Sequence, residues 1–267
     1  MTASSQPDRV LLISDLHLSP ARPDLVQGLY AFLRDQAAGC RALYILGDLF
    51  DAWVGDDDDT PLYADIAAAL QRFVASGSAL YLMHGNRDFL LGTAYAEACG
   101  ATLLPEPHVL EHLGRRYLLL HGDVLCTQDT EYQALRAMVR NPGWQQQILQ
   151  RPLAERRALA AQLREKSRTM SSNKPEDIMD VTPGESRRLL EQHQVGVLVH
   201  GHTHRPALHW LLCGEMPCRR IVLGDWDQDG WYVAIDATGP QLTRFALTVG
   251  VTAVPPRTGE SEASLAR

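Results

Sequence analysis

The stretch A-L-Y-I-L-G-D at residues 42–48 is a short apolar run that ends in a glycine and a carboxylate. An apolar run of this length, closed by a turn residue, predicts a buried strand. Similar runs occur at Val10–Ser14 and Ala79–His84, and apolar residues at helical spacing occupy Asp24–Ala38 and Pro61–Ala75. This alternation of strand and helix predicts an α/β fold for the first part of the chain.

The rest of the chain divides by its pattern of helix and strand formers. We expect a helix at Phe89–Cys99 and then a hairpin in which Val109–Leu113 and Tyr117–Leu120 flank Gly114. Helix formers dominate residues 126–193, and strands then return. The expected helices are Thr130–Arg140, Leu153–Arg168 and Gly184–His193, and the expected strands are Val195–His200, Ala207–Leu212, Arg219–Leu223, Trp231–Ile235 and Leu242–Leu247. We therefore expect a core from residues 1–125 and 194–250, a helical lid inserted at 126–193, and a disordered tail at 251–267.

The composition is that of a globular protein with an acidic balance. The 267 residues include 25 Lys and Arg against 32 Asp and Glu, a formal charge of −7, and 45% are hydrophobic. The acidic balance argues against nucleic acid as a partner, because a general nucleic-acid binder needs a basic face. Five scattered cysteines without a C-x-x-C pair argue against a disulfide framework, and the polar N-terminus lacks the apolar stretch of a signal peptide. We expect a cytoplasmic protein.

Five short polar motifs stand just after apolar strands. They are Asp15-Leu16-His17, Gly47-Asp48-Leu49-Phe50-Asp51, Gly85-Asn86-Arg87-Asp88, His121-Gly122-Asp123 and Gly201-His202-Thr203-His204. In open α/β sheets, ligands bind at the carboxyl ends of the strands, so these motifs have one natural meeting place. Any one motif alone is more simply explained as a helix cap or a turn, but the set predicts a common site.

The motifs supply carboxylate, imidazole and amide ligands and no thiolate. Mixed oxygen and nitrogen ligands suit Mn²⁺, Fe²⁺ or Zn²⁺ in sites of five or six ligands. Seven candidate ligands are too many for one ion, whereas two ions that share a carboxylate need about this number. The glycines beside Asp48, Asn86, His121 and His202 permit tight turns and close backbone approach.

Together the five motifs resemble those of the calcineurin-like metallophosphoesterases over roughly residues 10–225. The resemblance implies a four-layer α/β/β/α sandwich with two bound metal ions, with Mn²⁺ as the expected metal. One ion would be held by Asp15, His17, Asp48 and His204. The other would be held by Asp48, Asn86, His121 and His202, so that Asp48 bridges the two.

Longer stretches narrow the resemblance to the UDP-2,3-diacylglucosamine hydrolases within that superfamily. They are residues 42–50 with Trp53 and the run Gly55–Asp58, His84–Gly92, Ile178–Val181 and His200–Pro206. The resemblance implies attack of metal-activated water on the α-phosphorus of UDP-2,3-diacylglucosamine, which gives UMP and 2,3-diacylglucosamine 1-phosphate (lipid X) in lipid A synthesis. It implies catalytic roles for Asp48, Asn86, Arg87 and His121, and substrate contacts from Asn86, Arg87, Asp129, Ser167, Ser171, Lys174 and His202.

Arg87 is informative because many metallophosphoesterases carry His after this Asn. An alkoxide leaving group needs a proton, but a phosphomonoester does not, because its second pKa is about 6. Arginine is a poor acid near neutral pH, yet its planar fork grips phosphate oxygens. Arg87 therefore favours a diphosphate substrate over a simple phosphodiester. The alternative is that Arg87 only pairs with Asp88.

The segment Arg151–Arg168 carries six basic residues against two acidic ones, with Leu153, Leu159 and Leu163 at helical spacing. A basic amphipathic helix suits an anionic membrane surface, and a diacylated substrate must be drawn from a membrane. We expect this lid to enclose the acyl chains and to attach the protein peripherally to the cytoplasmic face of the inner membrane, and we expect a monomer. The alternative is an ordinary solvated basic face.

Two other functions remain open at this stage. The first is a soluble nucleotide pyrophosphatase, phosphodiesterase or nuclease on the same dimetal centre; Arg87 speaks against the phosphodiesterases and the acidic charge against the nuclease. The second is a metal-free interaction module, which should have lost some of the seven ligands. The acidic run Asp56–Asp59 is expected to be a solvated or substrate-side loop, because adjacent carboxylates cannot all converge on one ion.

Overall fold

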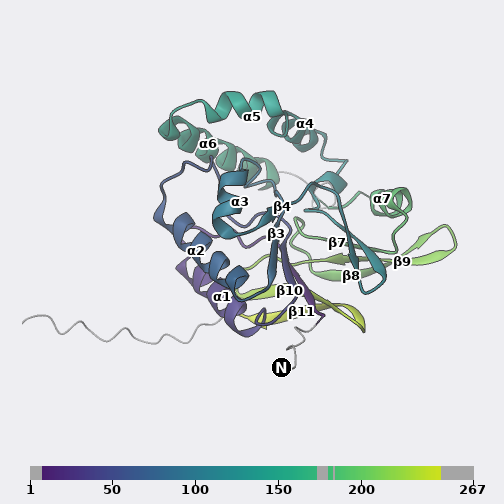
Figure 1. Ribbon diagram of the computed structural model, residues 1–267. Helices are drawn as coiled ribbons and strands as arrows, with labels where there is room; N and C mark the ends of the chain where they lie inside the picture. Colours follow the sequence, from purple (N-terminus) through teal and green to yellow (C-terminus); the bar gives the residue numbers. More distant parts are fainter. Residues whose placement is uncertain (1–7, 173–179, 183, 248–267) are drawn as a thin grey trace, which may run out of the picture.

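Two β-sheets pack face to face in the computed structural model, which describes residues 8–172, 180–182 and 184–247 (Figure 1). In the first sheet, short buried runs pair in parallel, and a C-terminal hairpin pairs antiparallel with β1. Its strands, in spatial order, are β11 (Gly239–Ala246), β10 (Asp229–Asp236), β1 (Val10–Ile13), β2 (Ala42–Ile45), β3 (Ala79–Leu82) and β4 (Thr102–Leu103).

Three helices cover the outer face of this sheet: α1 (Pro23–Asp35), α2 (Pro61–Ala75) and α3 (Thr93–Cys99). Leu29 and Phe32 of α1 and Leu70 of α2 pack in one buried cluster with Leu43 and Ile45 of β2. Burial of such side chains contributes about 1.5–3 kcal/mol each, so these faces fix the first half of the chain.

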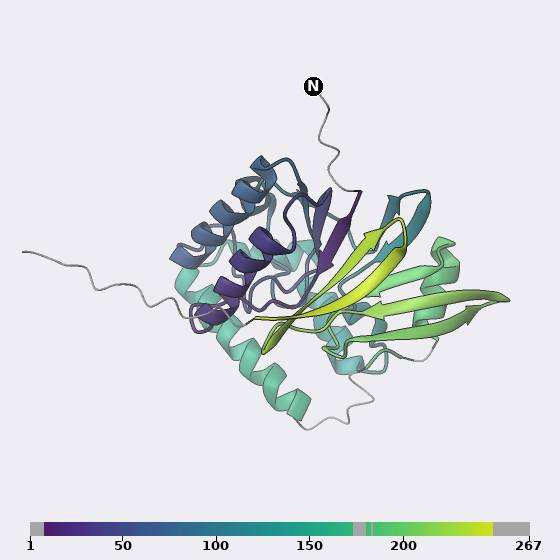
Figure 2. The ribbon, with the colours of Figure 1, turned by 90° about the horizontal axis from the view of Figure 1, so that it is seen from below.

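The second sheet has the order β5 (His108–His112), β6 (Arg115–Leu119), β7 (Val197–His200), β9 (Met216–Val222) and β8 (Ala207–Cys213). Helix α7 (Glu185–His193) covers its outer face, where Leu189 and Leu190 pack with Leu118 and Leu198. Tyr44, Tyr117 and Val199 belong to the cluster between the two sheets. Figure 2 shows α1 and α2 on one side and α7 on the other, which confirms the four-layer α/β/β/α sandwich.

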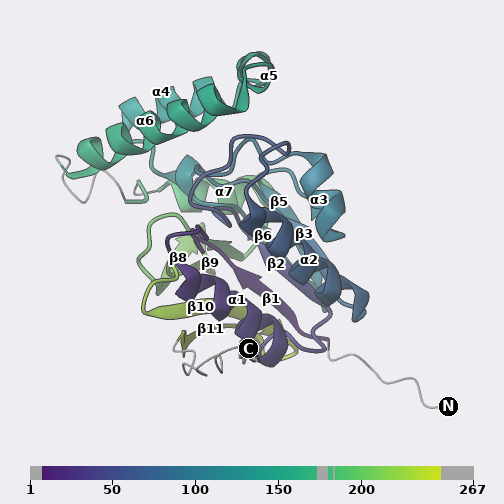
Figure 3. The same ribbon diagram turned by 90° about the vertical axis from the view of Figure 1, so that its left-hand side faces the viewer.

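Helices α4 (Thr130–Val139), α5 (Pro142–Leu149) and α6 (Leu153–Ser172) form a three-helix layer at one end of the sandwich (Figures 1 and 3). Helix α5 was not predicted from the sequence. Pro142 stands in its first turn, where its missing N–H is no loss, and the Asn141 side chain accepts a hydrogen bond from Trp144 N at 3.1 Å. The segment Asn141-Pro142-Gly143 therefore ends α4 and starts α5. The division into core, lid and tail remains a prediction, and residues 251–267 lie outside the described residues.

The helix expected at Phe89–Cys99 begins only at Thr93. Residues 89–92 form a loop instead, because Asp56 accepts a hydrogen bond from Gly92 N at 2.8 Å and from Tyr95 N at 3.0 Å. The two-residue strand β4 was too short to show a pattern. Within the described ranges, no helix has the length and apolar character needed to span a membrane.

Candidate dimetal site

The five polar motifs lie at the carboxyl ends of five strands. The loops after β1, β2 and β3 belong to the first sheet, and those after β6 and β7 belong to the second. The Asp15 N–H donates to Gly47 O at 3.1 Å and the Gly201 N–H donates to His121 O at 2.7 Å, so neighbouring loops are tied together. The predicted convergence of these motifs is present in the structure.

Asp15, His17 and His204 form a first cluster. Asp15 Oδ1 lies 3.4 Å from His204 Nε2 and 4.0 Å from His17 Nε2, and the two imidazole Nε2 atoms are 3.3 Å apart. One ligand atom from each residue is thus aimed at a common point, as three ligands of one cation would be.

Asn86, His121 and His202 form a second cluster. Asn86 Oδ1 lies 2.9 Å from His121 Nε2 and 2.8 Å from His202 Nδ1. His121 Nδ1 lies 2.9 Å from Leu46 O, and since a carbonyl only accepts, the proton of the neutral ring sits on Nδ1. The Nε2 lone pair of His121 therefore faces the cluster, as a metal ligand requires.

Asp48 lies between the two clusters. Its Oδ2 is 3.8 Å from His17 Nδ1 in the first, and its Oδ1 is 3.9 Å from His121 Nε2 in the second. A carboxylate with one oxygen toward each cluster is placed to bridge two cations. This is the arrangement that the sequence analysis expected for this residue.

The chemistry of the unsatisfied atoms fits cations. Among the described residues, Asp15 Oδ1 and His17 Nδ1 are buried and have no hydrogen-bond partner. Buried polar atoms without partners are costly, at about 1–3 kcal/mol each, unless a ligand completes them. Both atoms belong to predicted ligands and face other ligand atoms. The residues therefore fit metal ions, while the identity of the metal is not fixed by them.

Burial and charge shift the pKa values of the ligands in both directions. Burial alone would lower the pKa of His121, but the charges of Asp48 and Asp15 raise it to about 9. Burial lowers the pKa of His17 to about 3 and that of His202 to about 4, so both imidazoles are neutral near pH 7. Burial raises the pKa of Asp48 to about 7, opposed by His121. Burial alone would raise the pKa of Asp15, but the imidazoles of His204 and His121 beside it hold the pKa below its usual value. Ligands of this kind bind cations as neutral imidazoles and carboxylates.

The backbone of the site is held in an unusual conformation. Within the described ranges seven non-glycine residues have a positive φ, and five of them are predicted ligands: Asp15 (57°), His17 (48°), Asp48 (52°), His202 (69°) and His204 (55°). Left-handed backbone at non-glycine residues is strained and clusters at functional sites. A Cβ on Gly85 would stand 2.1 Å from Asp48 Oδ1, so only glycine fits beside this ligand.

Asp88 supports Asp48 from behind. Its carboxylate accepts hydrogen bonds from Gly85 N at 2.7 Å, Leu49 N at 2.8 Å and Asp48 N at 3.2 Å. Within the described residues, no ion pair joins Arg87 to Asp88; Arg87 Nε is buried without a partner, and Arg87 lines a pocket. This geometry disfavours the alternative in which Arg87 only neutralises Asp88.

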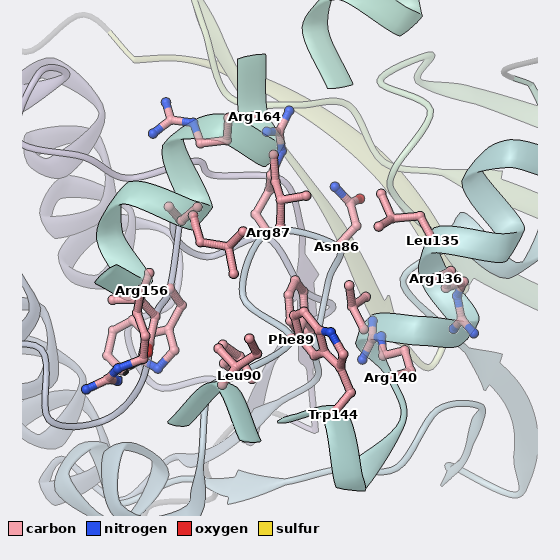
Figure 4. Close-up of a pocket in the computed structure, with 18 of the residues that line it drawn as sticks. Asn86, Arg87, Phe89, Leu90, Leu135, Arg136, Arg140, Trp144, Arg156 and Arg164 are labelled. Atoms are coloured by element: carbon pink, nitrogen blue, oxygen red, sulfur yellow. Dashed lines mark hydrogen bonds between the residues drawn. The ribbon is translucent and has the colours of Figure 1, made fainter. Parts of the chain in front are cut away.

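A pocket of about 840 Å³, part of it open to solvent, lies between the sandwich and the three-helix layer (Figure 4). Asn86 and Arg87 line it together with apolar side chains from both sides. The apolar lining comprises Ala52, Trp53, Val54, Phe89, Leu90, Leu135, Val139, Trp144, Ile148, Leu159, Ala160 and Leu163. One pocket thus joins a polar end beside the second cluster to a largely apolar interior.

The acidic run Asp56–Asp59 docks helix α6. Arg156 donates to Asp57 Oδ1 at 2.7 Å and to Val54 O at 2.5 Å, and Arg157 donates to Asp58 Oδ1 at 2.5 Å and to Asp59 Oδ1 at 2.6 Å. Arg164 pairs with Asp51 in the same way. The run is partly solvated, as expected, since the side chains of Asp57 and Asp59 are exposed. It is also a docking contact within the chain, because Arg156 and Arg157 of the segment Arg151–Arg168 are turned toward it.

The remaining predicted contacts are placed less completely. Asp129 is the N-cap of α4 and accepts from Tyr132 N at 3.0 Å, which is a structural role, and it does not line the pocket. Ser167 and Ser171 belong to helix α6, in the part where the structure describes the backbone and not the side chains. Lys174 lies outside the described residues.

Further residues support the ligands from behind, and of these only Asp123 belongs to a motif identified in the sequence. Asp123 accepts from Tyr132 Oη at 2.8 Å and pairs with Arg136, and Glu106 accepts from His121 N at 2.7 Å. Asp123 stands in a motif, but no local pattern marks Glu106, Tyr132 or Arg136.

Sequence comparison with known proteins shows the family of the chain. The calcineurin-like phosphoesterase family matches residues 8–206. The chain is 56% identical to the UDP-2,3-diacylglucosamine hydrolase of Cellvibrio japonicus, over 88% of this chain and 98% of that protein. It is 50% identical to the enzyme of that name from Marinobacter nauticus, over 88% of this chain and 96% of that protein. Among solved structures, Yfce, a phosphoesterase from E. coli, aligns at a TM-score of 0.42 and 15% identity, over 90% of this chain and all of that one.

Proposed function

The chain belongs to the calcineurin-like phosphoesterase family, and from this premise we propose that it is a UDP-2,3-diacylglucosamine hydrolase of lipid A synthesis. The reaction is attack of water on the α-phosphorus of the diphosphate, which releases UMP and 2,3-diacylglucosamine 1-phosphate. The pocket beside the second cluster carries this proposal, because it joins a polar end suited to a diphosphate with apolar walls suited to acyl chains.

The seven ligands would hold two divalent cations, with Mn²⁺ as the proposed metal. The first cluster would hold one, the second cluster the other, and Asp48 would contact both. When bound, such a pair neutralises phosphoryl oxygens and lowers the pKa of water so that hydroxide forms near neutral pH. Asp88 contributes by fixing the Asp48 backbone, and Leu46 O by fixing the His121 tautomer.

Arg87 would grip the phosphate that becomes the leaving group. Its side chain lines the pocket beside Asn86. Its backbone N–H donates to Asp48 Oδ1 at 2.8 Å, so the position of Arg87 is fixed relative to the carboxylate that faces both clusters. A guanidinium fork binds two phosphate oxygens at once and keeps its charge at any working pH. Since the leaving phosphomonoester needs no proton, the site needs no general acid at this position.

The apolar walls would hold the two acyl chains between the sandwich and the three-helix layer. Leu159 and Leu163 of α6 line the pocket together with Phe89 and Leu90 of the sandwich. The predicted polar contacts of Ser167, Ser171 and Lys174 belong to the same proposal, as does that of His202, whose ring stands in the second cluster.

We propose that the protein works at the cytoplasmic face of the inner membrane, where a diacylated substrate resides. The basic segment Arg151–Arg168 was expected to supply the contact, but Arg156, Arg157 and Arg164 are paired with the sandwich. The β8–β9 hairpin offers a second surface, with exposed Leu208, Trp210, Leu212 and Met216. Flotation with anionic vesicles, repeated with Trp210→Ser and with the exposed control Met138→Ser, tests both the attachment and this surface; no flotation at any salt concentration contradicts the attachment.

The function is tested by product analysis with UDP-2,3-diacylglucosamine and Mn²⁺ in ¹⁸O-labelled water. We expect UMP and the acylated sugar phosphate, with the label in UMP, because water attacks the uridine-side phosphorus. Label in the sugar phosphate would contradict the proposed point of attack. Equal turnover of the deacylated UDP-glucosamine would instead indicate a soluble nucleotide pyrophosphatase on the same site.

A further inference from the structure

Helix α4 contributes no ligand, but its side chains contact the second cluster at two points directly and at a third point through Glu106. The Tyr132 ring lies over the His202 ring, with centroids 5.8 Å apart and planes at 33°. Arg140, at the C-terminal cap of α4, donates to Gly85 O at 2.9 Å, next to Asn86. The third contact reaches His121 through an ion-paired chain of side chains.

Two consecutive hydrogen bonds link Arg136 to Glu106 and Glu106 to the backbone of His121. Arg136 Nη2 donates to Glu106 Oε2 at 2.9 Å, while Glu106 Oε1 accepts from His121 N at 2.7 Å. Arg136 Nε also donates to Asp123 Oδ2 at 2.8 Å. One guanidinium thus holds two carboxylates in fixed positions, and one of those carboxylates holds the peptide group of a ligand.

Because these side chains are largely buried, the positions of Glu106 and Asp123 depend on the charge of Arg136. The side chains of Glu106 and Asp123 are 9% and 0% exposed, and that of Arg136 is 21% exposed. Two buried carboxylates this close repel each other unless a cation lies between them, and Arg136 supplies it. Without Arg136, the hydrogen bond that fixes the Glu106 carboxylate is lost, so this carboxylate can move and its hydrogen bond to His121 N is altered.

The first cluster lacks such support from α4. In the described part of the chain, neither Tyr132, Arg136 nor Arg140 makes a hydrogen bond or ring contact with Asp15, His17 or His204. Loss of the α4 contacts should therefore affect the two clusters unequally.

We propose that Arg136 and Glu106 are positioning residues that hold His121 in the second cluster, so that helix α4 sets the affinity of this cluster for its cation. The inference rests on the proposed dimetal site. Outer partners that orient ligands typically change metal affinity by about 10–100-fold when they are removed. The same helix forms a wall of the pocket through Leu135 and Val139, so the contents of the pocket and the second cation are physically linked.

The test is a titration of the full-length, metal-free chain with Mn²⁺, in which electron paramagnetic resonance measures the unbound ion. The wild type should bind two Mn²⁺ per chain. In Arg136→Met, one of the two dissociation constants should rise by about 10–100-fold and the other should change by less than about twofold. Arg136→Lys, which keeps the charge without the fork, should show a smaller rise.

Two further variants make the result specific. Glu106→Gln keeps an oxygen for His121 N but loses the charge that pairs with Arg136, so it should weaken the same single Mn²⁺ site. Arg34→Met removes an exposed arginine that pairs with its neighbour Asp35 on α1, and it should leave both sites unchanged. Circular dichroism and thermal melting identify any variant that does not fold; if Arg136→Met is one, Arg136→Lys and Glu106→Gln decide.

The outcomes separate this inference from the proposed function. Unchanged binding in folded Arg136 and Glu106 variants, or equal weakening of both sites, overturns the inference and leaves the dimetal proposal intact. A wild-type chain that binds no Mn²⁺, Fe²⁺ or Zn²⁺ overturns both. Selective loss of one site in the Arg136 and Glu106 variants, with normal binding in Arg34→Met, supports the positioning role.

Discussion

The cluster of ligands at the strand ends and the docking contacts of helix α6 both depend on carboxylates, yet they use them oppositely. At the strand ends, Asp15 and Asp48 are buried, have strained backbones and face other ligand atoms. At the docking contact, Asp59 is exposed and Asp57 and Asp58 meet arginines from a distant helix. The ligand carboxylates destabilise the fold and form a site, whereas the docking carboxylates stabilise the position of α6, which forms a wall of the pocket.

This difference predicts which substitutions should reduce activity and which should reduce stability. Charges buried at the ligand cluster act on chemistry, since their interactions with a phosphate are not screened by water. Exposed ion pairs contribute little to stability and are weakened by salt. The four predictions below test that ordering, from the ligand cluster outward.

The largest effect is expected for Asp48→Asn, which removes the carboxylate that faces both clusters. Turnover of UDP-2,3-diacylglucosamine should fall by about 10³-fold or more, because a lost Lewis-acid contribution of several kcal/mol corresponds to about that factor. UMP release and the number of Mn²⁺ bound per chain are the measurements. Asp65→Asn on the exposed side of α2 is the matched control; a loss of less than tenfold in Asp48→Asn would falsify the bridging role.

Arg87→Ala should follow, with a loss of about 10²-fold in kcat/KM, as expected when one preorganised donor to a phosphate is removed. Mn²⁺ binding should be retained, because Arg87 supplies no predicted ligand. Arg87→Lys restores the charge without the fork and should recover only part of the rate. Normal turnover of the diphosphate by Arg87→Ala would remove the reason for assigning a diphosphate substrate to this site.

Arg156→Met tests the inner end of the docking contact. The side chain is 2% exposed and donates to Val54 O, Arg151 O and Asp57, so its loss should loosen α6 by about 1–3 kcal/mol. Backbone hydrogen exchange should rise in α6 but not in β1 or β2. Arg151→Met, an exposed neighbour, is the control; equal exchange in both variants would mean that Arg156 does not dock the helix.

The smallest effect is expected for Arg157→Gln at the outer end of the same contact. Its side chain is 44% exposed and its partner Asp59 is more exposed still. Its other partner, Asp58, has a buried side chain but also accepts hydrogen bonds from Thr60 N and Thr60 Oγ1, so the free energy of unfolding should fall by no more than about 1 kcal/mol. Urea unfolding at low and at high salt is the measurement, and the difference from wild type should shrink at high salt. A larger, salt-independent loss would place this pair with the buried charges.

The strand-end site was predictable because its signals are local. A short apolar run, a glycine and a polar side chain appear within a few residues, and the carboxyl ends of the strands bring five such runs together. The four-layer fold followed from the alternation of helix and strand and from the family resemblance. The predicted ligands Asp15, Asp48 and His121 therefore lie where the sequence analysis placed them.

The docking contact and the support of His121 were not predictable by the same means. Arg156 and Asp57 are 99 residues apart, and a charge carries no information about its partner. Glu106 stands in a loop and Arg136 on a helix, with nothing in either neighbourhood to connect them. Helix α5 was missed because Asn141-Pro142-Gly143 indicates a break, and the sequence alone does not show whether a helix resumes directly after it.

The left-handed backbone at five of the ligands has a consequence for anyone who screens variants by heat resistance. Glycine adopts such φ values freely, so His204→Gly or His17→Gly in a chelator-treated sample should relieve local strain while it destroys a metal ligand. A library ranked by melting temperature alone would then select inactive variants, as expected where residues required for activity lower stability.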